Sequence, residues 1–142
     1  MTRFVIGPDV ALHLARQVAV IAADHQLVAP TLLRSHVLSL LYQAVRRGDV
    51  TQADADRQLD YLRGLRIRLL GDRVLQRAAW RLAEQLGWED TFDAEYVALT
   101  RLQADAFVTL DAGLAMAVQG LVTIAEPRDL LARTAEPNAA EA

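Results

Sequence analysis

The stretch TFDAEYVALTRLQADAFVTLDAGLA, residues 91–115, decides the fold of this chain. Apolar residues at helical spacing predict a helix over 92–103. The run AFVTL at 106–110 is the most strand-like in the sequence, and a short helix follows it. Asp93 opens the first helix and Asp111 ends the strand. Acids are favoured at helix starts, where they meet free N–H groups and the positive end of the helix dipole. Both acids are therefore either helix-start residues or carboxylates directed at one shared point.

Outside this stretch, short apolar runs alternate with segments of helical spacing. RFVI (3–6), RIRLL (66–70) and LVTI (121–124) predict strands, and LVA (27–29) predicts a short strand or an extended connector. Helices are predicted from Pro30 to about Arg47, from Thr51 to about Leu62, over 72–86 and, as a last turn, near 128–132. The helix over 72–86 is expected to turn inward Val74, Leu75, Ala78, Leu82 and Leu86. Because no hairpin signal separates the strands, we expect an α/β fold with a mostly parallel central sheet.

Length and composition limit the class of protein. The 142 residues, 53% of them hydrophobic, suit a single domain over 1–132, followed by a disordered tail over 133–142. The apolar runs are too short to span a membrane, and the absence of cysteine excludes disulfides and thiolate zinc sites, so we expect a cytoplasmic protein. All 15 basic residues are arginine, and the net charge of −3 argues against binding nucleic acid by bulk charge alone.

The segment VALHLARQVAVIAA, residues 10–23, is unusually apolar. A single core can hardly bury such a helix all round, so apolar surface would remain near the N-terminal helices. The segment therefore predicts self-association, or binding of a small protein partner, through this surface.

Several polar residues follow predicted strand ends. Ligands of parallel sheets bind beyond the carboxyl ends of the strands, and Asp9 and Asp111 both lie just past such an end. Clustered carboxylates can hold a hard cation that polarises a phosphate and activates water. We therefore take Asp93 and Asp111 as candidate catalytic and metal-binding residues. Thr109 and Asp90 are candidates to support them by hydrogen bonding from outside the site.

The motifs resemble a known family. Residues 91–115 resemble the second half of a PIN domain, the ribonuclease fold of VapC toxins, and VAPTLLRSHVLSLLYQAVRRGDVT (28–51) is similar to another block of that family. The resemblance implies a three-layer α/β/α domain and RNA cleavage with Mg²⁺ or Mn²⁺ held by about four acids. It also implies an RNA substrate, a cognate antitoxin of the VapB type and a homodimer.

The sequence departs from the family pattern at two of the four acids. Asp93 and Asp111 match the third and fourth, whereas Gly7 and His36 hold the places of the first and second. Asp9 is the acid nearest the first place, but two helical residues turn a side chain by roughly 200°, so Asp9 is predicted to point away from position 7. Asp9 and His36 nevertheless remain candidate metal ligands, and an imidazole suits Mn²⁺ better than Mg²⁺.

Two functions stay open on this basis. One is a metal-dependent endoribonuclease of the VapC type. The other is a degenerate PIN domain that has lost nuclease activity and acts as a binding or regulatory module. If the two lost acids matter, Gly7→Asp together with His36→Glu is expected to create or strengthen a divalent-metal site.

Overall fold

The computed structural model describes residues 1–132 of the chain; the tail predicted over 133–142 lies outside the described residues. Its centre is a five-stranded sheet in the order β3-β2-β1-β4-β5, and every neighbouring pair is parallel. The strands are β1 (Thr2–Ile6), β2 (His25–Pro30), β3 (Ile67–Leu70), β4 (Ala106–Val108) and β5 (Ile124–Ala125). The predicted α/β class with a parallel sheet is confirmed.

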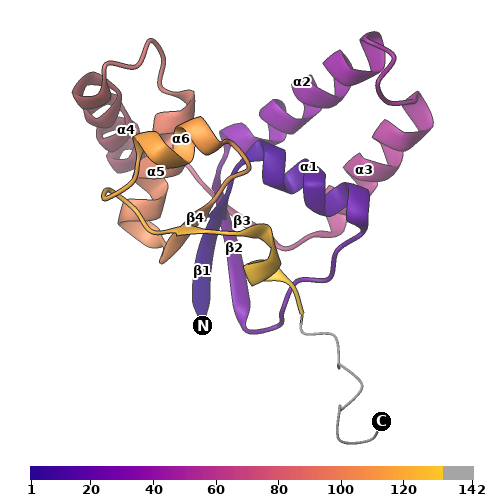
Figure 1. Cartoon of the computed structure of the whole chain (residues 1–142), viewed down its shortest axis with the longest axis horizontal. Coiled ribbons are helices and arrows are strands. Elements are labelled where there is room, and N and C mark those ends of the chain that lie inside the picture. Colours follow the sequence, from indigo (N-terminus) through magenta and orange to yellow (C-terminus); the bar gives the residue numbers. More distant parts are fainter. Residues whose placement is uncertain (133–142) are drawn as a thin grey trace, which may run out of the picture.

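Helices cover both faces of the sheet and complete a three-layer α/β/α architecture (Figure 1). One layer holds α1 (Pro8–Gln17), α2 (Leu32–Arg46) and α3 (Gln52–Gly64). The other holds α4 (Arg73–Leu86) and α5 (Phe92–Gln103), which pack closely on each other. The short α6 (Ala112–Ala117) follows β4, and a single 3₁₀ turn, η1 (Pro127–Leu130), follows β5.

Local sequence signals set these boundaries. Thr51 and Asp72 cap α3 and α4 by accepting hydrogen bonds from the backbone N–H groups of Asp54 and Leu75, respectively. Gly87 ends α4 in the left-handed region (φ 68°), where glycine is favoured. β1 is central, and Val5 and Ile6 are fully buried because helices cover the sheet on both sides.

Two details of the predicted elements are wrong. The strand expected at 121–124 is reduced to Ile124–Ala125, because residues 118–122 form a turn in which the Leu121 and Val122 N–H groups both donate to the Val118 carbonyl. Val74 does not face inward on α4 but is 61% exposed. The buried residues of this helix are Leu75, Ala79, Leu82 and Ala83.

The apolar segment 10–23 is buried only in part within the monomer, so apolar surface remains there as expected. α1 lies against α2 and α3, and it buries Val10, Ala11, Leu12, Leu14 and Ala15. Val18 and Val20, which follow the helix, stay exposed at 72% and 70%. Self-association, or partner binding, through this exposed apolar surface therefore stays a prediction. Over residues 1–132, the helices are too short or too polar to cross a membrane.

Candidate functional site

The carboxyl ends of β1 and β4 form the point where the strand order reverses. The chain leaves β1 through α1 to reach β2 on one side, whereas β4 pairs with β1 on the other side. In open parallel sheets, such a switch point leaves a crevice that binds ligands. The residues that follow these two strands, Gly7 to Asp9 and Thr109 to Asp111, therefore stand at the edge where a site is expected.

Asp9 is bonded across this crevice. Its Oδ2 accepts hydrogen bonds from the Leu110 backbone N–H (2.9 Å) and the Thr109 hydroxyl (3.1 Å), and its Oδ1 accepts one from the Val10 N–H (2.8 Å). A Cβ atom built on Gly7 would lie only 2.7 Å from Asp9 Oδ1. The Asp9 carboxylate therefore occupies the space of a side chain at position 7.

The prediction that Asp9 points away from position 7 is wrong. Gly7 is the N-cap of α1 and has an extended backbone (φ −77°, ψ 167°). The helical rotation between residues two apart therefore does not apply from position 7 to position 9. The carboxylate instead turns back over the strand end.

Asp111 and Thr109 continue this network. Asp111 is the N-cap of α6, and its Oδ1 accepts a hydrogen bond from the Leu114 N–H (3.0 Å). The Asp111 N–H donates to the Thr109 hydroxyl oxygen (3.1 Å), and that hydroxyl donates to Asp9. Thr109 thus links the two acids at the ends of β1 and β4. The Leu110 N–H also donates a hydrogen bond to Asp9. Sequence analysis missed this contact because the donor is a backbone group, which does not depend on the type of residue.

Asp93 lies in the first turn of α5 and is open to solvent on one side. Partial burial raises the pKa of its carboxyl, and the neighbouring Asp111, Asp90 and Asp9 carboxylates raise it further, while His36 lowers it. These charges act on Asp93 from α1, α2 and the start of α6. Asp90 serves the start of α5, since its Oδ1 accepts a hydrogen bond from the Phe92 N–H (3.1 Å).

Replacing Asp93 by asparagine is expected to stabilise the protein at neutral pH. An acid whose pKa is raised on folding costs stability above that folded pKa, and the cost disappears as the pH falls below the unfolded value of 3.8. At this exposed site we expect a rise in Tm of about 1–3 °C at pH 7. Thermal melts of Asp93→Asn and wild type from pH 3 to pH 8 measure this. A gain that is as large at pH 3 as at pH 7 would contradict the assignment to charge.

His36 belongs to an aromatic cluster on the inner side of α2. Its Nδ1 shares a hydrogen bond of 3.1 Å with the hydroxyl of Tyr96, a residue only 1% exposed. The two rings stack with centroids 6.0 Å apart, and the Phe92 ring lies 5.8 Å from the His36 ring. Burial raises the pKa of the Tyr96 hydroxyl, which stays protonated. The Nδ1 atom of His36 is therefore engaged in a hydrogen bond within the protein.

The donor set does not fit the metal site that the resemblance implies. Over residues 1–132, no group of three or more His, Asp or Glu side chains is placed to hold an ion. Gly7 supplies no ligand, and three hydrogen bonds from the protein fix the direction of the Asp9 carboxylate. Asp111 caps a helix with Oδ1, and His36 is neutral when it coordinates. Within the described part of the chain, the Asp93 carboxylate and Oδ2 of Asp111 have no assigned hydrogen bond, so the crevice offers fewer free carboxylates than the about four that the resemblance implies.

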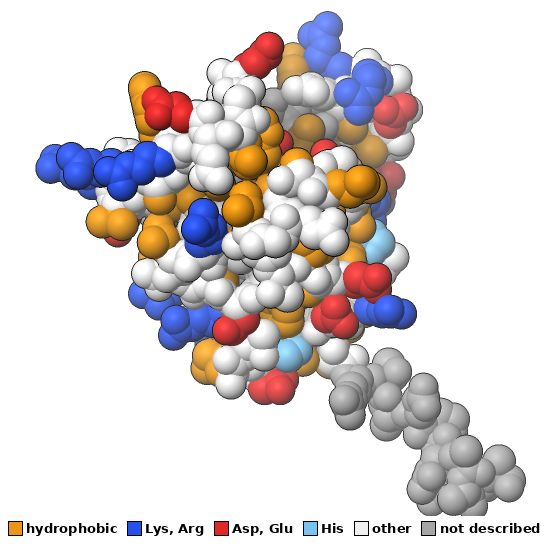
Figure 2. Space-filling model, turned by 60° about the vertical axis from the view of Figure 1, so that its left-hand side comes forward, with side chains coloured by type: hydrophobic (Ala, Val, Ile, Leu, Met, Phe, Trp, Pro, Cys, Tyr) orange, Lys and Arg blue, Asp and Glu red, His pale blue; other side chains and the backbone are white. Residues whose placement is uncertain are grey.

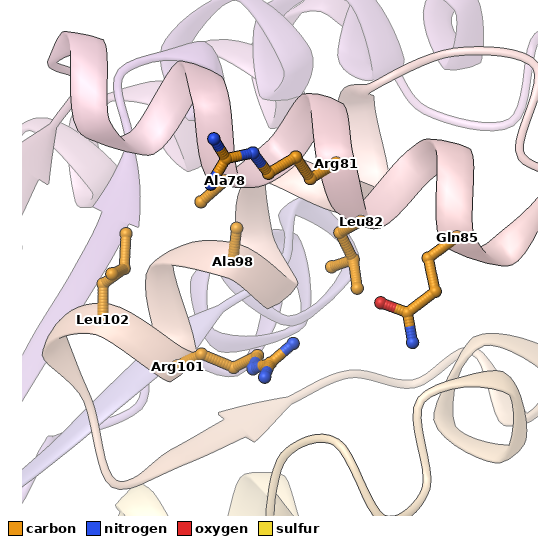
Figure 3. Close-up of a pocket in the computed structure, with 7 residues that line it drawn as sticks. All are labelled: Ala78, Arg81, Leu82, Gln85, Ala98, Arg101 and Leu102. Atoms are coloured by element: carbon orange, nitrogen blue, oxygen red, sulfur yellow. The ribbon is translucent and has the colours of Figure 1, made fainter.

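A separate cavity lies between α4 and α5. It measures about 450 Å³ and is lined by Ala78, Arg81, Leu82, Gln85, Ala98, Arg101 and Leu102 (Figure 3). The two arginines come from different helices and stand on opposite walls (Figure 3). On the side of the molecule that carries α4 and α5, arginine side chains surround exposed apolar patches (Figure 2). This cavity contains no acid or histidine, so it is not part of the crevice.

The sheet order, the three layers and the acid-bearing switch point define a PIN-like fold. The chain is similar to the crystal structure of PAE2754 from Pyrobaculum aerophilum, with a TM-score of 0.67 and 19% identity over 90% of this chain and 92% of that one. It is also similar to a chain of VapBC2 from Rickettsia felis bound to a DNA fragment from their promoter, with a TM-score of 0.63 and 9% identity over 87% and 98%. No family model and no curated protein matches the sequence. At these identities the comparisons establish the fold.

Proposed function

We propose that this chain is a toxin-like PIN domain that binds an antitoxin-type protein and lacks metal-dependent nuclease activity. One observation carries the second half of this proposal. The space at the end of β1 is filled by the Asp9 carboxylate, which is bonded to the protein on both oxygens. Mg²⁺ demands near-octahedral geometry, and a carboxylate whose direction is fixed by three protein hydrogen bonds cannot turn to meet that demand, so we expect Mg²⁺ and Mn²⁺ to bind this crevice weakly.

The antitoxin half of the proposal is supported by the similarity to VapBC2, a complex bound to DNA from its promoter, and by a groove. The groove, of about 450 Å³, lies between α2, α3 and β3 and is lined by apolar side chains that include Leu33, Val37, Leu38 and Leu62. Arg34 and Arg63 also line it. Arg63 already pairs with Asp60, whereas no ion pair within residues 1–132 is assigned to Arg34. We propose that the occupant is an apolar segment of the antitoxin with an acidic residue beside it, because Arg34 would pair with that residue.

RNA cleavage with Mg²⁺ or Mn²⁺ is the second candidate function. It is favoured by the charges of Asp9, Asp90 and Asp111, which act together on Asp93 and make the crevice attractive to a cation. An RNA substrate would then reach the crevice edge through its phosphates. The proposal above is preferred because repulsion among acids attracts an ion without supplying the ligand geometry that holds it.

RNA cleavage by the purified protein decides between the two candidates. A structured RNA pool is incubated with wild type and with Asp93→Asn/Asp111→Asn, in 5 mM Mn²⁺ or in EDTA, at about equal protein and RNA concentrations. We expect the same background in all four reactions. Cleavage by wild type that needs Mn²⁺ and is lost in the double variant would refute the proposal and establish the nuclease.

A further inference from the structure

The space around Gly7, and not its backbone conformation, restricts which residue fits at this position. Its φ of −77° and ψ of 167° are open to any residue. The surrounding space is the restriction, since a Cβ atom would lie 2.7 Å from Asp9 Oδ1, closer than ordinary van der Waals contact, and 3.8 Å from the Val108 carbonyl oxygen. A side chain at position 7 therefore requires the Asp9 carboxylate to move.

Moving the Asp9 carboxylate would break hydrogen bonds that it accepts from the protein. Two of its three hydrogen bonds come from Thr109 and Leu110, residues about 100 positions further along the chain. They join the start of α1 to the loop between β4 and α6. Displacing the carboxylate leaves the Leu110 N–H and the Thr109 hydroxyl without this acceptor. The Thr109 hydroxyl also accepts a hydrogen bond from the Asp111 N–H. A shift of the Asp9 carboxylate would therefore also disturb the backbone at Asp111.

We infer that Asp9 is a positioning residue. Its carboxylate occupies the space of a side chain at position 7, and it holds the start of α1 to the loop that carries Asp111 by hydrogen bonds. The acid at this strand end stands at position 9 instead of position 7, and its carboxylate is held by three hydrogen bonds from the protein. This inference deepens the proposed function and rests on it, because it explains why the metal site is incomplete.

A double-mutant cycle between positions 7 and 9 tests the inference. Gly7→Ala is expected to lower Tm by about 3–6 °C in wild type, because the new Cβ displaces the carboxylate. In the Asp9→Ala background, the same substitution is expected to lower Tm by only about 1–2 °C, because the carboxylate is gone and the weaker preference of alanine for the N-cap position is all that remains. Gly64→Ala is the matched control, since a Cβ there meets no atom within 4 Å, and its effect should be equal in both backgrounds.

A local readout separates positioning from general stability. Amide hydrogen exchange at Leu110 and Asp111 is expected to speed up about tenfold in Asp9→Ala and to stay unchanged in Gly64→Ala. If Asp9→Ala does not fold, Thr109→Val serves as the second background. There the loss of Tm caused by Gly7→Ala should shrink by about half, because the hydrogen bond from Thr109 to Asp9 is already absent. An equal effect of Gly7→Ala in every background, or unchanged exchange at both amides, would overturn the inference. Neither result depends on RNA or metal, so this outcome is distinct from a failure of the proposed function.

Discussion

Replacing Gly7 by aspartate is expected to lower Tm by roughly 6–12 °C. The new side chain would enter space that the Asp9 carboxylate occupies, with its Cβ 2.7 Å from Asp9 Oδ1. It also brings a second carboxylate close to that of Asp9, and neighbouring like charges repel each other where water is partly excluded. The expectation from sequence that Gly7→Asp together with His36→Glu creates a metal site stays a prediction; the structure adds that, with Asp9 present, the new side chain meets a steric and electrostatic conflict.

Adding Asp9→Ala to Gly7→Asp is expected to recover about half or more of the lost Tm. Asp9→Ala should therefore be destabilising in wild type and stabilising in the Gly7→Asp variant. Thermal melts of the four proteins measure this change of sign, with Asp56→Ala as a control that removes an exposed acid from α3, far along the chain. If Asp9→Ala lowers Tm by the same amount in both backgrounds, the two positions do not share one space.

Leu38→Asp is expected to weaken binding of the antitoxin-type partner about 30-fold or more. Leu38 lines the groove between α2 and α3 and is 56% exposed, so it is available to a partner. The substitution removes apolar contact and adds a negative charge beside a surface that we expect to bind acidic residues. The probe is a small protein encoded beside the gene, identified by sequencing the neighbouring open reading frames and titrated calorimetrically against the whole chain.

Trp80→Asp is the matched control for this experiment. Trp80 is 64% exposed on α4, in the layer on the opposite face of the sheet. It should leave the affinity within about twofold of wild type, since it lies outside the groove. Equal losses for both variants, or no complex with the wild-type chain, would contradict the assignment of the groove.

The fold was predictable where periodicity and burial agree. α5 begins and ends at residues 92 and 103 as expected, because its apolar spacing is regular and it is followed directly by a strand. β5 was not predictable in extent: LVTI has strand-forming residues, but local hydrogen bonds to Val118 hold the first half in a turn. Val74 was misplaced because one residue of error along a helix rotates a side chain by about 100°.

The site was predictable only in part, because its decisive contacts join residues far apart in sequence. The positions of Asp93 and Asp111 follow from strand and helix starts, which sequence patterns reveal. The bond from Leu110 to Asp9 depends on the pairing of β1 with β4 and on a backbone donor, neither of which has a residue signal. The contact between His36 and buried Tyr96 joins α2 to α5 and was likewise hidden.

Direct Mn²⁺ binding tests the central claim, that the crevice lacks a resident-metal site because Asp9 has filled the strand end. The free-ion signal in electron paramagnetic resonance is titrated with wild type, Asp9→Asn and Gly7→Asp/Asp9→Ala. We predict no saturable binding to wild type below about 1 mM, and about tenfold tighter binding to the double variant, whose carboxylate returns to the strand end beside Asp93 and Asp111. Binding of one Mn²⁺ by wild type with a micromolar Kd, abolished in Asp9→Asn, would contradict the account.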